Sequence, residues 1–216
     1  MLKLISKETA LSLMSFPVGK KVAFLLLLYE RMMPALISFR RAERLDLSVF
    51  LEARAKFWHS LIQGASTASW ARLRDDILNS IPDSEDFGSQ AASFALDTGL
   101  VASDIAGLLQ DGQEIHIVEA MQYALDSLNG FVLDEMGIVA FDRSSIASIR
   151  KLVGAHALVQ KERQREEQDV AVLRAMPDTP WSEDIVARLR DRAAMQGSLF
   201  GDSREGSQPS ANDLLH

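Results

Sequence analysis

Apolar side chains recur every three or four positions along most of this 216-residue chain, and this spacing restricts its fold more than any other feature. Such spacing puts the apolar residues on one side of an α-helix, whereas a half-buried β-strand needs strict alternation. No alternating run of β-branched residues between hairpin turns is found in the sequence. We therefore expect an all-α fold, a single-domain multi-helix bundle of seven to nine helices with a long C-terminal helix.

Prolines and glycines predict where these helices end. The expected helices cover residues 6–16, 18–44, 48–64, 70–81, 89–110, 113–137, 144–176 and 179–197, and Pro34 either kinks the second one or opens a new helix there. The long helix at 144–176 has a highly charged middle, residues 161–169, which is expected to project into solvent or to cross an exposed edge. The helical domain is assigned to residues 1–200. Residues 201–216 are polar and rich in serine and glycine, which predicts a disordered tail.

The most apolar run of the chain, Val22–Tyr29, is only eight residues long and has charged residues on both sides. A membrane-spanning helix needs about 20 apolar residues, and a signal peptide needs a cleavage site of small residues after its apolar run. We therefore interpret the run as a buried helix and expect no membrane association. The chain has no cysteine, which excludes disulfides and thiolate chemistry and is compatible with a cytoplasmic location.

Charge is distributed unevenly along the chain, whose net charge is −7. Residues 46–142 contain four basic and sixteen acidic residues, a net charge of −12, whereas residues 1–45 carry an excess of five positive charges. A section with this negative charge repels the phosphate backbone of nucleic acids, so we do not expect nucleic-acid binding. It could attract a basic protein partner, or it could simply keep the surface solvated.

The sequence contains none of the short motifs that indicate catalysis or cofactor binding. It lacks a phosphate-binding glycine loop, a nucleophile elbow and an HExxH zinc motif. No two of the four histidines (His59, His116, His156 and His216) lie three or four positions apart. We therefore assign no catalytic residue, no metal site and no cofactor. The sequence favours a non-enzymatic protein but leaves an enzyme open.

A few charged residues interrupt otherwise apolar helices and form the candidate binding site: Glu30, Arg31, Asp86 and Asp97. A charge on an apolar helix should be paired or should face a cavity. One hypothesis is a carboxylate cluster steered by Arg31, which could bind a cation or act as acid and base. The alternative is a structural pair between Arg31 and a carboxylate, which fastens the acidic loop at residues 82–88 to the core.

The same segments resemble the YjaG-like family, the bacterial domain of unknown function 416. The matching elements are Tyr29–Pro34, Phe57–Leu61, Ile81–Phe87, Ala95–Asp97, Asp184–Arg190 and Gly197. The resemblance covers roughly residues 18–200 at low identity and in the correct order. In this chain Phe94 stands where the family has a proline, and Ser89–Ser93 replaces a tyrosine-rich turn. The family implies an all-helical cytoplasmic protein and brings no established activity.

Residues 196–200, with Gln196, Leu199 and Phe200 as key positions, resemble the short peptide by which bacterial proteins dock on the replication sliding clamp. The segment lies between the last helix and the tail, where such a peptide would be accessible, and both apolar side chains could fill a pocket on the clamp. The alternative is a helix stop at Gly197, after which Leu199 and Phe200 fold back onto this domain.

Three functional hypotheses follow from the sequence. The first is a protein–protein interaction module that presents an acidic face. The second is a small-ligand-binding protein or enzyme that uses Glu30, Arg31, Asp86 and Asp97. The third is a sliding-clamp-associated factor. Association of two copies of the chain stays open in all three.

Overall fold

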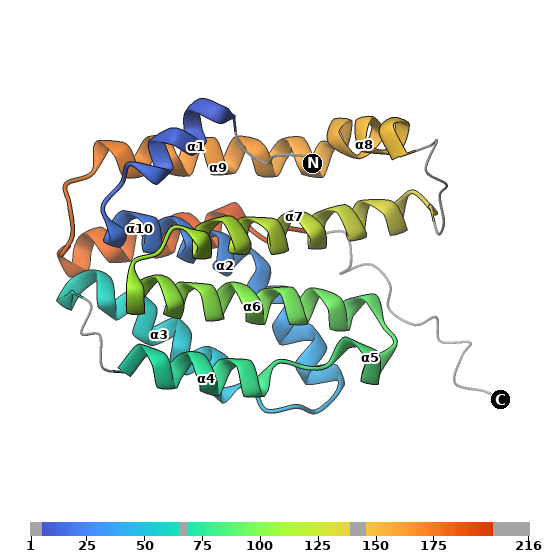
Figure 1. Cartoon of the computed structure of the whole chain (residues 1–216), viewed down its shortest axis with the longest axis horizontal. Coiled ribbons are helices and arrows are strands. Elements are labelled where there is room, and N and C mark those ends of the chain that lie inside the picture. Colours follow the sequence, from blue (N-terminus) through green and yellow to red (C-terminus); the bar gives the residue numbers. More distant parts are fainter. Residues whose placement is uncertain (1–5, 65–68, 139–145, 201–216) are drawn as a thin grey trace.

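The computed structural model describes residues 6–64, 69–138 and 146–200, and every regular element in these ranges is a helix. The all-α prediction is confirmed (Figure 1). The helices are α1 (Lys7–Met14), α2 (Val18–Ala42), α3 (Ser48–Gln63), α4 (Trp70–Ser80), the single turn α5 (Ser84–Phe87), α6 (Gln90–Asp111), α7 (Ile115–Glu135), α8 (Ile146–Ala155), α9 (Ala157–Ala175) and α10 (Glu183–Gln196). The tail predicted at 201–216 lies outside the described residues.

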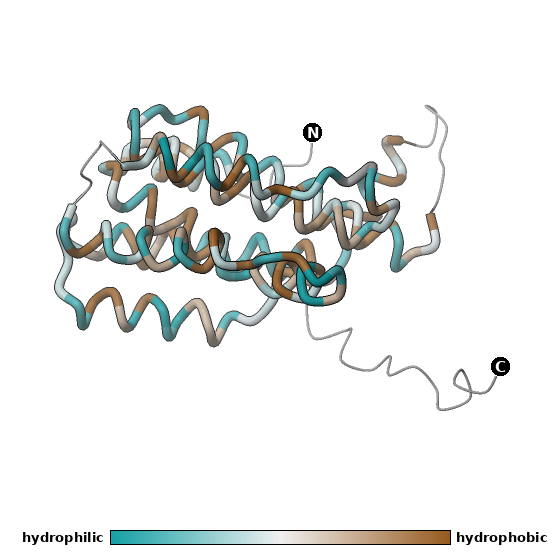
Figure 2. The backbone as a smooth tube through the Cα atoms, turned by 90° about the horizontal axis from the view of Figure 1, so that it is seen from below, coloured by the Kyte–Doolittle hydropathy of each residue, from teal (hydrophilic) through white to brown (hydrophobic). Residues whose placement is uncertain are grey.

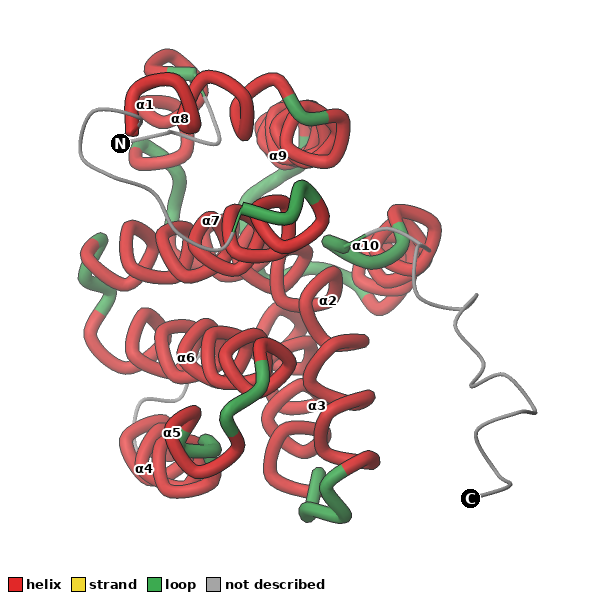
Figure 3. The backbone as a smooth tube through the Cα atoms, turned by 90° about the vertical axis from the view of Figure 1, so that its right-hand side faces the viewer, coloured by secondary structure: helices red, strands yellow, loops and turns green. Residues whose placement is uncertain are grey.

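The helices form two main layers with a cover at one end. Helices α4, α6 and α7 lie side by side, with α6 in the middle, and this layer packs against α2 and α3 (Figures 1 and 3). Helix α9 runs along the α7 side of the bundle together with α1 and α8, and α10 packs on α2 and α3. Helix α2 therefore has neighbours on nearly every side.

The burial of α2 follows from its composition. Every residue from Val22 to Tyr29 is fully buried, which confirms that this run is a core helix. A helix that is apolar all round has to be enclosed by other elements. Figure 2 shows polar and apolar residues interspersed along the helices, and an amphipathic helix such as α4 buries its apolar side chains Trp70, Leu73 and Ile77.

Two described helices, α2 and α6, are long and apolar enough to cross a bilayer on length and composition alone. In this bundle 72% and 78% of their most apolar windows are buried inside the protein. Burial of that extent is typical of the central helices of a multi-helix fold.

The predicted long C-terminal helix is interrupted. Helix α8 ends at Ala155, and His156 adopts an extended conformation before α9 begins. The imidazole Nδ1 of His156 accepts a hydrogen bond from the Leu158 backbone N–H at 3.3 Å, so this side chain caps α9. Pro34, by contrast, lies inside an uninterrupted α2. The break at His156 could not be predicted from the spacing of apolar residues, because a histidine that caps a helix does not change that spacing.

Candidate functional site

Arg31 lies at the centre of the bundle and is fully buried on α2. Its Nε donates to Glu162 Oε1 at 2.8 Å, and its Nη1 donates to Asp169 Oδ2 at 2.8 Å and to Gln196 Oε1 at 2.7 Å. The carboxylates that pair with Arg31 thus belong to α9. The hypothesis that Arg31 fastens the acidic loop to the core is wrong in its partner, because the carboxylates that pair with Arg31 lie on α9.

The charged middle of the predicted long helix has one buried face, and only its other face is exposed to solvent. Glu162, Glu166 and Asp169 are four and three positions apart, so they share one face of α9, and all three are fully buried. Arg165 donates to Glu162 at 3.3 Å, and Arg192 of α10 donates to Asp169 at 2.9 Å. Neither carboxylate oxygen of Glu166 has a hydrogen-bond partner in the described chain. Burial raises the pKa of Glu166 well above its ordinary value, with the neighbouring Glu162 adding to the effect.

Glu30 faces the other side of α2. Its carboxylate accepts two hydrogen bonds from Arg54, at 2.6 and 2.7 Å, and one from Trp58 Nε1 at 2.7 Å. The guanidinium of Arg190 lies over the Trp58 ring, 5.4 Å from its centroid. Glu30, Arg54 and Arg190 border an open cleft of about 490 Å³ between α2, α3 and α10. We call it the Glu30 cleft.

The two remaining candidate residues lie elsewhere. Asp86 is exposed on the one-turn helix α5. Asp97 lies on α6, where its carboxylate accepts a hydrogen bond from Ser127 Oγ of α7 at 2.6 Å. Burial raises the pKa of Asp97 to about 6, an effect that the Ser127 bond opposes and the charge of Asp126 increases. Glu30, Arg31 and Asp97 therefore have separate partners and Asp86 is exposed, so the four residues do not form the single cluster considered from the sequence.

Asp97 instead belongs to a row of acidic residues that sequence reasoning missed. Asp97, Asp104 and Asp111 recur every seven positions, which places them along one side of α6. Asp104 is only 4% exposed, and its Oδ2 has no hydrogen-bond partner among the described groups. Burial raises the pKa of Asp104 to about 6, against the opposing effect of His116.

His116 of α7 bridges two of these aspartates. Its Nδ1 lies 3.1 Å from Asp104 Oδ1, and its Nε2 lies 3.2 Å from Asp111 Oδ2. The ring fits because α6 has a glycine opposite it: a β-carbon at Gly107 would lie 2.5 Å from His116 Cε1. A glycine inside a helix costs about 1 kcal/mol relative to alanine, and here it makes room for the imidazole.

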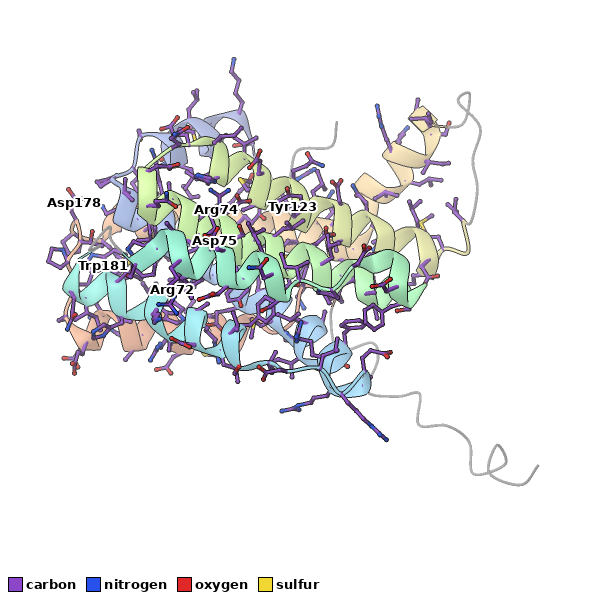
Figure 4. The ribbon with its side chains drawn as sticks, turned by 60° about the horizontal axis from the view of Figure 1, so that its bottom comes forward. Arg72, Arg74, Asp75, Tyr123, Asp178 and Trp181 are labelled. Carbon is purple, nitrogen blue, oxygen red and sulfur yellow. The ribbon has the colours of Figure 1, made fainter. Side chains whose placement is uncertain are left out.

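Helix α7 extends the row with two more acids, Glu119 and Asp126. Burial and the nearby charges of Asp104 and Glu119 raise the pKa of Tyr123, whose ring lies among the acids. On the other side of α6, Arg74 Nε donates to Ser103 Oγ at 3.3 Å. Figure 4 shows Arg74 and Tyr123 over the same face of the molecule. We define the acidic seam as Asp97, Asp104, Asp111, Glu119 and Asp126.

The predicted docking peptide folds back on its own domain. Leu199 is 1% and Phe200 8% exposed. The Leu199 N–H donates to the Arg31 backbone carbonyl at 2.8 Å. The Phe200 ring stacks on Phe94 with centroids 4.6 Å apart and contacts Phe131 at 5.2 Å. The expected accessibility of this segment is therefore wrong. Phe94, which replaces a proline of the family pattern, forms part of the pocket that receives Phe200.

These features define an all-α protein that has a charged cluster in its core and an acidic seam on its α6–α7 surface. The chain belongs to the family described as "Protein of unknown function (DUF416)", whose pattern matches residues 9–198. The resemblance found in the sequence is thereby confirmed. Among solved structures, the chain is similar to the crystal structure of a DUF416 family protein from Shewanella baltica OS155. The two share 19% identity and a TM-score of 0.75, with 88% of this chain and 95% of that chain covered, so the similarity shows the fold. The comparison with curated proteins gave no match.

Proposed function

We propose that this protein is an interaction module whose acidic seam binds a basic segment of another protein. The observation that carries the proposal is the excess of carboxylates along α6 and α7. Arg74 and His116 are basic side chains close to the acids of α6, and even both together leave the five acids of the seam with a negative surplus. A partner that supplies lysines and arginines would complement this charge and would associate faster because of it.

The surface beside the seam fits an amphipathic partner. Ile115 and Val118 are each 49% exposed. Val118 and Glu119 follow Ile115 by three and four positions, and Asp126 follows Glu119 by seven. The four residues therefore share the outer face of α7. A basic helix with an apolar stripe could place the stripe on Ile115 and Val118 and its cations on the acids. This arrangement is the partner chemistry that we propose.

The proposal is tested with a labelled, helical, lysine- and leucine-rich peptide of about 20 residues and the full-length protein. Neutralising two acids of the seam, in Asp97→Asn with Asp126→Asn, should weaken binding about tenfold, equivalent to about 1.4 kcal/mol. The matched control, Glu183→Gln with Asp191→Asn, removes two exposed charges from α10 and should leave the dissociation constant nearly unchanged. Binding should also weaken with added salt. Equal effects of both double variants would refute a specific role of the seam.

A second candidate function is the binding of a small carboxylate-bearing molecule in the Glu30 cleft. The supporting observation is that Arg54 and Arg190 border a cleft of suitable size, and that Glu30 is the only carboxylate among the described residues that line it. A panel of small carboxylic acids would be screened by the rise in melting temperature. Any rise should vanish in Arg190→Gln and persist in Arg188→Gln, a neighbouring exposed arginine. A panel without a hit would remove this candidate.

Docking on the sliding clamp is the third proposal, and it requires Leu199 and Phe200 to leave the positions described above. Addition of the clamp should then accelerate hydrogen exchange of the Leu199 amide, whose N–H bonds to Arg31 in the folded chain. Unchanged protection of this amide at saturating clamp would count against docking through this segment.

A further inference from the structure

We propose that Asp104, His116 and Glu119 form a binding site for a divalent transition-metal ion of the Zn²⁺ class. Each residue offers one ligand atom, and these three atoms all lie within 4.8 Å of one another. Imidazole nitrogen and carboxylate oxygen are ligands that zinc accepts, at about 2.0–2.2 Å. Two donors on one tetrahedral zinc ion lie about 3.4 Å apart, and Nδ1 of His116 is 3.1 Å from Asp104 Oδ1.

The second ring nitrogen of His116 already has the partner that metal-binding histidines usually have. Its Nε2 faces Asp111 Oδ2 at 3.2 Å, so an N–H at Nε2 would donate to that carboxylate. The lone pair of Nδ1 is then directed toward Asp104, where the ion would lie. Metal-ligating histidines commonly donate their other N–H to a carboxylate in this way, which fixes the tautomer and the ring orientation.

An independent observation comes from Asp104, whose side chain is only 5% exposed. One of its oxygens faces His116, while Oδ2 is buried and has no hydrogen-bond partner in the part of the chain that the structure describes. A buried carboxylate with one oxygen left without a partner is costly, and the charge of a small cation bound to Asp104 would offset that cost. The bulky head group of a lysine or arginine from another protein would have to reach beneath the surface to do the same.

A glycine of α6 also helps to position the imidazole of His116. Gly107 leaves the space in which the imidazole lies, and any side chain there would move His116 away from Asp104. Glu119 follows His116 by three positions on α7, so both project from the same side of the helix. Three protein ligands leave one position of a tetrahedral ion open to water, which is the arrangement of reactive zinc sites.

The inference does not rest on the proposed binding of a basic partner, because it concerns a small ion beneath the surface. The competing explanation for the same contacts is a protonated His116 that bridges Asp104 and Asp111 without any metal. The two explanations differ in whether the full-length protein binds zinc at one site.

Calorimetric titration of the chelator-treated, full-length protein with ZnCl₂ tests the site. We expect one ion per chain, with an affinity that falls at least about tenfold in Glu119→Gln and in His116→Gln. Asp111→Ala should weaken binding about 10–100-fold, because it removes the group that orients the imidazole. Asp126→Asn, another seam acid outside the site, should bind as the parent does. Circular dichroism of each variant without metal verifies folding, and the exposed position of the Glu119 carboxylate makes that variant the safest test.

Co²⁺ in place of Zn²⁺ should give the visible absorption of a tetrahedral nitrogen and oxygen site, and this signal should be absent in Glu119→Gln. Absence of saturable zinc binding would overturn the inference. Equal weakening by Asp126→Asn, or equally tight binding of Mg²⁺ and Ca²⁺, would also overturn it, since either result indicates diffuse attraction to the acidic seam. Loss of peptide binding in the Asp97 and Asp126 double variant with zinc binding intact would separate this site from the proposed partner surface.

Discussion

Replacement of Asp97 by asparagine should stabilise the protein, and the gain should grow with pH. The pKa of Asp97 is raised from 3.8 to about 6, mainly by burial. The folded state therefore holds the Asp97 proton more tightly than the unfolded state does. The resulting stabilisation is complete below the unfolded pKa and is lost as pH rises through about 6. A shift of about two pKa units corresponds to about 3 kcal/mol, which partial exposure reduces to about 2–3 kcal/mol.

Asparagine removes this penalty at pH 8 and keeps the local geometry. Its carbonyl oxygen can accept the hydrogen bond that Ser127 Oγ now donates to the carboxylate. At pH 4 the parent side chain is protonated in the folded state and about 40% protonated in the unfolded state, so the gain should fall below about 1 kcal/mol. For a chain of this size, about 2–3 kcal/mol at pH 8 raises the melting temperature by about 5–10 °C.

Urea unfolding and thermal scans at pH 4, 6 and 8 measure this difference. The control is Asp126→Asn, which removes a neighbouring but exposed charge. Its effect should stay within about 0.5 kcal/mol at every pH. A gain of Asp97→Asn that is equal at pH 4 and pH 8 would show that charge burial is not the cause. A loss of stability at pH 8 would refute the reasoning altogether.

Three further substitutions test the charged core and the C-terminal anchors. Arg31→Met leaves Glu162 and Asp169 without their buried cation and should cost about 3–5 kcal/mol in urea unfolding; a loss under 1 kcal/mol would contradict the pairing. Phe200→Ala should cost about 3 kcal/mol, because its ring fills a pocket in this domain, and an unchanged unfolding midpoint would show that the segment is not anchored. Glu166→Gln should flatten the dependence of melting temperature on pH: the raised pKa makes the parent lose stability as pH rises above the ordinary glutamate range, whereas glutamine does not titrate. An equal decline in the parent and Glu166→Gln would assign the pH dependence to other groups.

The sequence was sufficient for the location of most helices. Pro17, Gly64, Pro82 and Gly112 lie at helix boundaries as expected, because a proline removes a backbone donor and a glycine accepts positive φ. The run from Val22 to Tyr29 lies in the core because no face of it is polar. These signals are local, so one sequence is enough to read them.

The charged segment of α9 shows where local reasoning fails. Glu162, Glu166 and Asp169 resemble a solvated helix face as long as no partner is in view. Arg31, the partner of Glu162 and Asp169, lies 131 residues before Glu162, and nothing in the spacing of either segment connects the two. Whether a charge is buried is decided by long-range packing, and apolar periodicity does not contain that information.

The acidic seam could be predicted from the sequence in part. The recurrence of Asp97, Asp104 and Asp111 at intervals of seven could have been detected as one side of a helix. His116 and Glu119 are three positions apart, a spacing that puts both side chains on one side of a helix. The spacing between histidines alone does not reveal such a pair of a histidine and a glutamate. Their meeting with Asp104 depends on how α6 and α7 pack, which the tertiary structure alone reveals.

The buried guanidinium of Arg31 has a consequence for biosynthesis. A ribosome makes α2 early, yet the carboxylates that neutralise Arg31 and the Leu199 amide that bonds to its carbonyl are added at the other end of the chain. A nascent chain that stops before α9 has to keep this cation in water, and with it much of the apolar helix around it. The charged core around Arg31 therefore forms only after α9 has been translated, although the residues of α2 are made long before.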